Sequence, residues 1–145
     1  MINIQTFLPY ADFQKSAECL DYKRLGKQRV EAKQIIDLLM RKDLGEDISK
    51  VAWGNHPAVK MWEGYLSALI EYHNVIIKEW IKRGYKNNMK LIGCPAIVKY
   101  PSWFGRKDFH NAHKSNLLRK DREFYSKYKW KVKDNLKYKI GRAHV

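Results

Sequence analysis

The sequence is poor in the residues that build metal centres and disulfide frameworks. It has only two cysteines in 145 residues, Cys19 and Cys94, and neither a CxxC pair nor an HExxH motif occurs. Two distant thiols cannot form a tetrahedral zinc site alone, and the sparse carboxylates do not cluster as a Mg²⁺ nuclease site requires. His110 and His113 lie three residues apart, but no group of carboxylates or cysteines accompanies them. We therefore expect reduced cysteines, no metal ion and no cofactor.

Motifs of several enzyme classes and segments typical of membrane or secreted proteins are also missing. GxSxG, Walker A and GxGxxG do not occur, so acyl transfer and nucleotide hydrolysis are unsupported. No run of about 18 apolar residues is long enough to span a bilayer. The opening MINIQTFLPY has no basic segment before an apolar run, as a signal peptide would. We expect a cytoplasmic protein (in the host cytoplasm if the source is viral) that does not act at membranes.

Positive charge is what the sequence has in excess. Its 29 Lys and Arg against 15 Asp and Glu give a formal charge of +14 and a pI of about 9.8. Residues 101–145 carry 13 Lys and Arg against 4 Asp and Glu, with eight aromatic residues among them. Such a charge attracts polyanions, and rings placed between cations can stack on bases. A solvated, lysine-rich surface over an aromatic core would give the same composition, so both interpretations stay open.

The length and apolar content predict one compact domain over residues 1–145. A hydrophobic content of 45% is enough for a core, and no internal repeat or linker is visible. The apolar spacing predicts a few helices around a long central helix, an extended N-terminal arm or short strand, and an irregular, aromatic and basic C-terminal segment. The expected helices run from a cap at Asp12 to a kink at Gly26, from Gln28 to Lys42, from Pro57 to a C-terminal Gly84, and from about Asn111 to Tyr128.

The stretch LDYKRLGKQRVEA concentrates cations at the start of a predicted helix, at Lys23, Arg24, Lys27 and Arg29. The helix dipole favours anions at that end, so the cluster indicates phosphate binding. On a helix, Lys27 and Glu31 share a face. One carboxylate in a cationic patch can act as a general acid or base. A surface ion pair of little energetic weight is the alternative.

Two further stretches carry polar groups suited to phosphate binding or proton transfer. In WGNHPAVKMW, His56 can bind a phosphate or assist proton transfer, or Asn55 or His56 can cap the helix that starts at Pro57. We expect Trp53 and Trp62 of this stretch in the core. FHNAHKSNLLRKDREFY is rich in donors to phosphate oxygens, with a solvent-facing surface as the alternative. Its candidate DNA contacts are His110, His113, Lys114, Ser115, Asn116, Arg119 and Lys120.

Four stretches resemble the pyrimidine-dimer DNA glycosylase family, the phage endonuclease V type of UV-repair enzyme, and in particular a bacterial branch of it. They are TFLPYADF, LDYKRLGKQRVEA, WGNHPAVKMW and KSNLLRKD. The resemblance runs over roughly residues 4 to 128 and is stronger to that branch than to the phage enzyme. It implies an all-α domain that acts on double-stranded DNA, excises a damaged base and then cleaves the strand at the abasic (AP) site without a metal. We expect a monomer.

The resemblance also implies a mechanism. The nucleophile of the family is the protein's own α-amino group, which attacks the sugar C1′ and forms a Schiff base that permits β-elimination of the 3′ phosphate. The pKa of an α-amine is about 8, and cationic neighbours lower it, so part of it is unprotonated at neutral pH. A carboxylate in the first helix stabilises the cationic sugar and moves protons. Arginines beside it hold phosphates while a base is flipped out of a kinked duplex.

Two positions depart from the family pattern. The residue after the initiator Met is small in the phage enzyme, whereas Ile2 is large, so we expect Met1 to be retained and to supply the amine. In the simplest alignment of DYKRL, Arg24 occupies the place of the catalytic carboxylate, and Glu31, about two turns onward, is our substitute. Its rivals are Glu18 and Asp21. Without a carboxylate in reach of the amine, the chemistry would be altered or lost.

These observations predict a DNA glycosylase with AP-lyase activity on a pyrimidine-dimer-like or otherwise modified base. We expect catalysis by Met1, Glu31, Arg24 and His56. The predicted DNA contacts are Lys23, Lys27, Arg29, Asn55, His110, His113, Lys114, Ser115, Asn116, Arg119 and Lys120. A non-catalytic DNA- or RNA-binding module is the alternative, since the charge alone suffices for it, while sparse carboxylates disfavour a metal-dependent nuclease.

Overall fold

The computed structural model describes residues 4–138, and over this range the protein is helical without any β-strand. The predicted all-α class is thereby confirmed. The elements of this part are α1 (Phe13–Cys19), α2 (Tyr22–Asp43), η1 (Ile48–Lys50), α3 (Pro57–Lys60), α4 (Leu66–Lys82), α5 (Lys107–Lys120), α6 (Arg122–Tyr125) and η2 (Ser126–Tyr128).

The first two helices begin at aspartate caps. The side chains of Asp12, as predicted, and of Asp21 each accept a hydrogen bond from a backbone N–H three residues onward. The sequence predicted a kink at Gly26, but the break falls at residues 20–21 and Gly26 lies inside α2. A Cβ on Gly26 would lie only 3.2 Å from the ring of Trp80, so the missing side chain allows this ring of α4 to approach α2 closely.

The long helix predicted after Pro57 is divided in two. Pro57 starts α3 as expected, but the chain turns at residues 61–65 before α4 begins at Leu66. Gly64 has a φ of +82° in this turn, a left-handed conformation that favours glycine and interrupts a helix. Gly84, with a φ of +86°, follows the end of α4 as predicted.

The last predicted helix is shifted and shortened. It starts at Lys107 rather than near Asn111, and α5 ends at Lys120. Asp121 then leaves helical geometry, and its side chain caps the short α6. Beyond η2, the described residues 129–138 are irregular, as predicted for the C-terminal segment.

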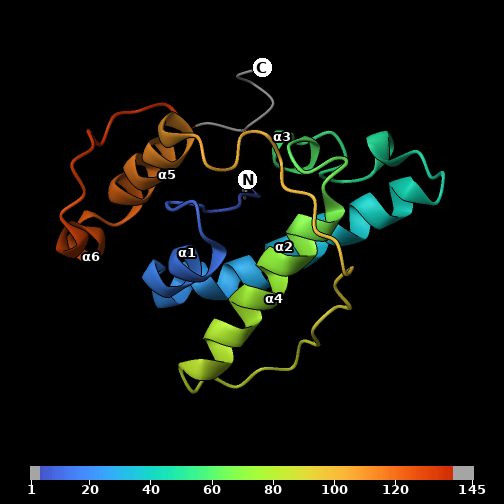
Figure 1. Cartoon of the computed structure of the whole chain (residues 1–145), viewed down its shortest axis with the longest axis horizontal. Coiled ribbons are helices and arrows are strands. Elements are labelled where there is room, and N and C mark those ends of the chain that lie inside the picture. The colour runs from blue at the N-terminus through green and yellow to red at the C-terminus, as the bar shows by residue number, and fades with distance from the viewer. Residues whose placement is uncertain (1–3, 139–145) are drawn as a thin grey trace.

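The core lies where α2, the longest helix of the described part, crosses α4 (Figure 1). Ile35 of α2 and Leu69 and Ile76 of α4 are buried in one apolar cluster. Trp62, in the turn between α3 and α4, is fully buried in the same cluster, so its predicted core position is confirmed. This crossing gives α2 a rigid support and leaves another face of the helix for the N-terminal arm.

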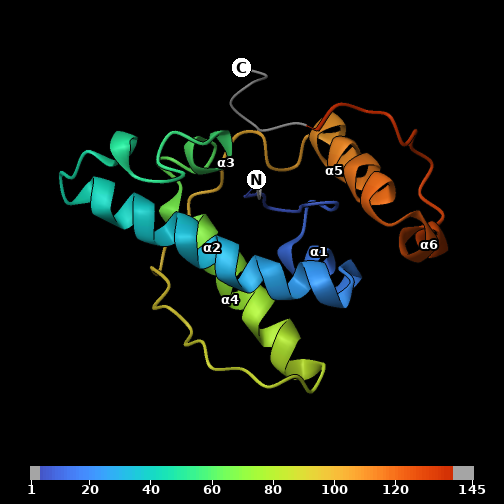
Figure 2. The ribbon, with the colours of Figure 1, turned by 180° about the vertical axis from the view of Figure 1, so that it is seen from behind.

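The N-terminal arm, residues 4–12, lies between α2 and α5, as the front and back views both show (Figure 1, Figure 2). On the α5 side, the N–H of Leu8 donates to Nδ1 of His113 at 3.0 Å. Nδ1 of His110 donates to the Leu8 carbonyl at 2.7 Å, and its Nε2 accepts from the N–H of Gly105 at 2.9 Å. His110 must be neutral to make both bonds, because a protonated ring has no acceptor nitrogen.

On the α2 side, one amide holds the arm. Nε2 of Gln28 donates to the Gln5 carbonyl at 2.7 Å, and its Oε1 accepts from the N–H of Phe7 at 3.2 Å. The hydroxyl of Tyr72 in α4 contacts the same Oε1 and the Phe7 carbonyl. The arm is therefore fixed from both sides along residues 5–8.

The hydrogen bonds of His110 with the arm predict that the stability of the protein depends on pH. Burial holds the pKa of His110 below its ordinary value of 6.5, so the unfolded chain binds a proton that the folded protein does not. The free energy of unfolding should therefore fall as the pH drops below about 6.5. In a His110→Gln variant the loss between pH 7.5 and 5.5 should shrink by on the order of 1 kcal/mol. Urea denaturation at the two pH values measures this difference.

His56→Asn is the matched control for this prediction. Asparagine also caps helices, and burial lowers the pKa of the half-buried His56 in the same direction. Because His56 is less buried than His110, which is 5% exposed, burial should penalise its charged form less, and its replacement should change the pH dependence less than His110→Gln does. An unchanged pH dependence in His110→Gln would show that the hydrogen bonds of His110 with Leu8 and Gly105 do not require a neutral ring.

Candidate active site

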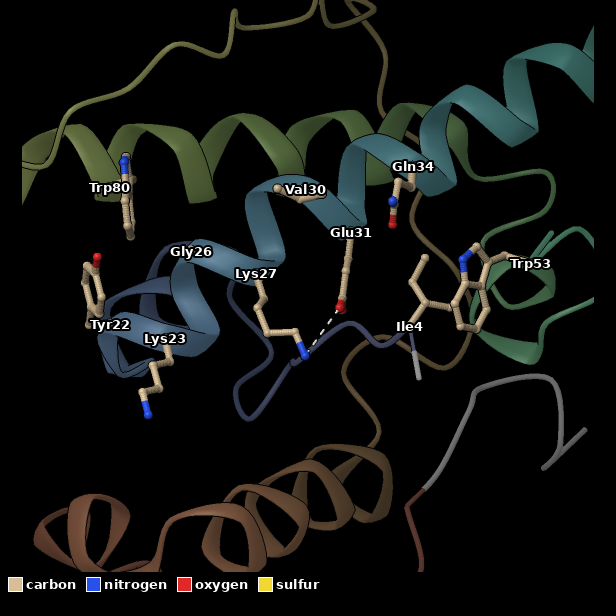
Figure 3. A pocket seen from close by; sticks show the side chains of 10 residues that line it. All are labelled: Ile4, Tyr22, Lys23, Gly26, Lys27, Val30, Glu31, Gln34, Trp53 and Trp80. Atoms are coloured by element: carbon tan, nitrogen blue, oxygen red, sulfur yellow. Dashed lines mark ion pairs between the residues drawn. The ribbon is translucent and has the colours of Figure 1, made fainter. Parts of the chain in front are cut away.

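A pocket of about 530 Å³ opens along the exposed side of α2, next to the start of the described arm (Figure 3). Its volume is within the range of ligand-binding pockets. Aromatic rings stand at its two ends, and charged side chains lie between them. The lining residues are Ile4, Tyr22, Lys23, Gly26, Lys27, Val30, Glu31, Gln34, Trp53 and Trp80.

Glu31 is the carboxylate of this pocket. Its side chain points from α2 toward the arm, and the residue is only 7% exposed. Oε1 accepts the N–H of Gln5 at 3.1 Å and the amide of Gln28 at 3.4 Å, while Oε2 lies 3.8 Å from Nζ of Lys27. Burial raises the pKa of Glu31 above its ordinary value, and the Gln5 hydrogen bond, Lys27 and Lys120 counteract this in part. A carboxyl group with such opposing influences suits proton transfer near neutral pH.

The cations beside Glu31 are lysines with exposed ends. Lys23 and Lys27 lie on the same side of α2 as Glu31 and point into the open part of the pocket (Figure 3). Lys120, at the end of α5, lies close enough that its charge affects Glu31. Partial burial, with Arg24 and Lys27 nearby, holds the pKa of Lys120 below its ordinary value. The three ammonium groups, two from α2 and one from α5, therefore lie around one region that attracts anions.

Arg24, predicted to be catalytic, is engaged in holding the fold. Its guanidinium pairs with Asp21 at 3.3 Å and donates to the Lys120 carbonyl at 3.4 Å. The hydroxyl of Tyr125 in turn donates to the Asp21 carboxylate, so this group is committed to the cap of α2. Glu18, the other rival for the catalytic carboxylate, is exposed and accepts a hydrogen bond from Gln14. Of the three candidates, only Glu31 lines the pocket.

Arg29 is likewise held by its own neighbours. Its guanidinium lies 4.1 Å from the ring centre of Trp80 and donates to Asn87 at 3.1 Å. Tyr22 stacks against Trp80 with ring centres 5.4 Å apart, and Tyr85 contacts both rings. Tyr22 and Trp80 close one end of the pocket and were not predicted from the sequence as site residues.

The WGNHP stretch lies at the other end of the pocket, and its polar pair, Asn55 and His56, makes hydrogen bonds within the protein. Nδ1 of His56 accepts the N–H of Ala58 and caps α3, one of the two roles predicted for it. Asn55 is exposed and donates to the Ser49 carbonyl at 3.1 Å. Trp53, expected in the core, is partly buried against the core and also forms part of the pocket wall.

The structure gives most of the α5 residues a different position from the one predicted. His110, His113, Ser115 and Asn116 are at most 7% exposed, because α5 turns this face to the arm and the C-terminal segment. Such burial argues against the DNA contacts predicted for them. Arg119 is exposed, but its guanidinium donates to Ser115 and to the carbonyls of residues 134 and 136.

Lys114 and the chain start complete the predicted set. Nζ of Lys114 lies over the rings of Tyr10 and Trp130, at 5.0 and 5.9 Å from their centres. Met1 lies outside the described residues, so its role stays a prediction. In the described range no three His, Cys, Asp or Glu side chains form a group that could hold a metal ion. No helix of that range is long and apolar enough to cross a bilayer.

An all-α domain with a single carboxylate in a lysine-lined pocket is typical of a protein that acts on a polyanion. Residues 4–93 match the family model described as pyrimidine dimer DNA glycosylase. The match covers more than half of the chain, so the chain belongs to this family of DNA-repair enzymes, and its substrate is DNA. Comparisons with curated proteins and with solved structures gave no match. The resemblance predicted from the sequence is confirmed, whereas the bacterial branch stays a prediction.

The burial of Glu31 predicts that its charge costs stability. Because burial raises the pKa above 4.5, the folded protein holds a proton more tightly than the unfolded chain, and ionisation above that pH is destabilising. Glu31→Gln should raise the free energy of unfolding at pH 7.5 by up to about 1 kcal/mol. The gain should vanish near pH 4, where the native carboxyl is protonated. Urea denaturation of both proteins over this pH range measures whether Glu31→Gln raises or lowers the free energy of unfolding.

Glu18→Gln provides the control for this measurement. Glu18 is exposed and outside the pocket, so its substitution should change the stability by less than about 0.5 kcal/mol at either pH. If Glu31→Gln instead loses stability at pH 7.5, the ionised carboxylate is an anchor of the arm and not a group held for chemistry.

Proposed function

We propose that this protein is a DNA glycosylase and AP lyase that excises a pyrimidine-dimer-like or modified base through the α-amine of Met1. The observation that carries the proposal is the hydrogen bond from the Gln5 N–H to Glu31, 3.1 Å long, in a lysine-lined pocket. It fixes the carboxylate beside the start of the described chain. The three residues before Ile4 span at most about 11 Å when fully extended, so the amine of Met1 can reach the pocket.

The proposed reaction proceeds in two stages on one sugar. The unprotonated amine attacks C1′, the glycosidic bond breaks with its electron pair going to the departing base, and a proton neutralises that base. The nitrogen loses a proton and forms a double bond to C1′ as the C1′–O4′ bond breaks and O4′ takes up a proton, which gives a protonated imine between the chain start and C1′. Removal of a C2′ proton places its electron pair in the imine as an enamine. Return of that pair forms the C2′–C3′ double bond and expels the 3′ phosphate.

Glu31 is the group we assign to the proton transfers and to the stabilisation of the cationic sugar. Its buried oxygens are held at fixed positions by Gln5 and Gln28, so they need not reorganise when positive charge develops on the sugar. Its raised pKa keeps it able to accept and return a proton closer to neutral pH than an exposed carboxylate.

Lys23, Lys27 and Lys120 are the residues we assign to the phosphates flanking the reacting sugar. Their exposed ammonium groups surround Glu31 from two helices, which supports a DNA backbone running past the pocket. Lys114 can extend this contact along α5. Since the charge alone would also suit a non-catalytic binding module, the covalent intermediate is the decisive test.

Borohydride reduction on a duplex with one abasic site should trap a covalent protein–DNA adduct. Glu31→Gln should slow adduct formation by about 100-fold or more, since positioned acid–base groups contribute that much. Glu18→Gln should stay within about twofold of the parent. EDTA should leave the reaction unchanged. If the parent protein binds the duplex but gives no adduct, the chain is a binding module, and inhibition by EDTA would indicate a metal nuclease.

Blocking the chain start should abolish trapping if Met1 supplies the amine. Acetylation of the N-terminus, or its extension by a short tag, removes or displaces the nucleophile without altering residues 4–138. Lys27→Ala serves as the comparison. It should weaken DNA binding, but the yield of trapped adduct at saturating DNA should stay the same as in the parent protein. The reverse pattern, with trapping lost in Lys27→Ala and kept in the blocked protein, would assign the imine to Lys27.

A further inference from the structure

The backbone of Trp53 adopts a conformation that bulky residues rarely take. Its φ is +71°, in the left-handed region that favours glycine and asparagine. Residues held in this region tend to occur at binding and catalytic sites, where the surrounding structure enforces them. Trp53 is one of only two non-glycine residues with a positive φ in the described range.

The turn around Trp53 is fixed tightly enough to enforce this conformation. A Cβ on the following Gly54 would lie 1.6 Å from the Ile48 carbonyl oxygen, so only glycine fits there. The N–H of Gly54 donates to the Val51 carbonyl, and the N–H of His56 donates to that of Trp53, both at 2.9 Å. The WGNHP stretch thus acts as a rigid support that presents one indole ring.

The ring presented in this way stands in the pocket. Figure 3 shows Trp53 beside Ile4, across the open space from the Glu31 carboxylate and the Gln34 amide. Its indole is only partly buried, and within the described residues its N–H has no hydrogen-bond partner. Gln34 is exposed and offers both a donor and an acceptor on the same side of Glu31.

We infer that Trp53 and Gln34 form a subsite for a single unstacked nucleobase, which Trp53 stacks against and Gln34 contacts at its edge. The inference rests on the proposed function, because it assigns Glu31 to the sugar attached to that base. Indole faces stack on bases of any sequence, and an amide can hydrogen-bond to a base edge. The subsite would thereby select for the base to be removed, independently of the lysines that hold phosphates.

The alternative is that Trp53 only covers Ile4. A covering side chain would not require a left-handed backbone, since an ordinary turn with a leucine would cover the same apolar surface. Tyr22 at the far end of the pocket is a less suitable platform for this base. One face of its ring is stacked on Trp80, and nine residues of helix, about 13 Å, separate it from Glu31.

Trp53→Asn separates base binding from the chemistry of the sugar. Asparagine tolerates a positive φ, so the turn is retained while the ring is removed. Excision of a thymine dimer from a duplex should fall about 10- to 100-fold. Borohydride trapping on an abasic duplex should stay within about threefold, since no base is present there to stack. Trp53→Phe should restore most of the excision, and Tyr100→Leu, a partly exposed ring outside the pocket, should match the parent.

A binding measurement tests the subsite even if no adduct ever forms. A duplex with one unpaired 2-aminopurine should lose fluorescence on binding to Glu31→Gln protein, because stacking on indole quenches the probe. With Glu31→Gln and Trp53→Asn combined, the fluorescence should rise instead. Equal quenching in both proteins, or equal losses of excision and trapping in Trp53→Asn, would overturn the inference. Quenching by Trp53 without any adduct would refute the proposed chemistry and keep the subsite.

Discussion

The buried amide of Gln28 joins the parts of the molecule on which the site depends. Its oxygen receives the N–H of Phe7 and the hydroxyl of Tyr72, and its nitrogen donates to the Gln5 carbonyl and to Glu31. A fully buried amide is destabilising unless its donors and acceptors are paired. Loss of one of these hydrogen bonds would therefore weaken the others. The same side chain thus sets the register of the arm against α2 and the position of the carboxylate. A shift of the arm by one residue would break both.

This arrangement explains how a strongly basic protein keeps one carboxylate free of a close arginine. Glu31 pairs with Lys27 at 3.8 Å and accepts hydrogen bonds from the neutral amides of Gln5 and Gln28, whereas Asp21 is bound by Arg24 and Tyr125. Burial raises the pKa of Glu31 even though the Gln5 N–H and the nearby lysines favour its ionised form. Asp21 is thereby used for structure, and Glu31, the carboxylate that we propose as the reactive one, stays able to exchange protons.

Local chemistry was predictable from the sequence, and long-range pairing was not. The cap at Asp12, the helix start at Pro57 and the glycine after α4 follow from residue types within one turn, and the structure confirms them. The role of Gln28 depends on partners 21 to 44 residues away, for which no spacing gives a signal.

The exposure expected for part of α5 was wrong for a related reason, since His110, His113, Ser115 and Asn116 are buried. Polar side chains in His110 and His113 suggested an exposed face, yet the extended arm needs partners for its backbone groups, and buried histidines supply them. Glu31 was predictable only as the carboxylate that directly follows the cations between Lys23 and Arg29 on the same helix. A positive φ at Trp53 has no sequence signal except the glycine that follows, so its position in the pocket could come only from the structure.

The arginines and the lysines near the pocket differ in whether they are free to contact DNA. The arginines predicted to hold DNA are occupied within the protein: Arg24 by Asp21, Arg29 by Asn87 and Trp80, and Arg119 by backbone carbonyls. The exposed charges around Glu31 are lysines, which attract phosphates as point charges without the planar geometry of a guanidinium. Phosphate contacts of this kind position a duplex but carry no sequence or lesion information. Discrimination between damaged and intact DNA must then come from the shape of the pocket and the rings that line it, or from the ease with which a damaged duplex bends.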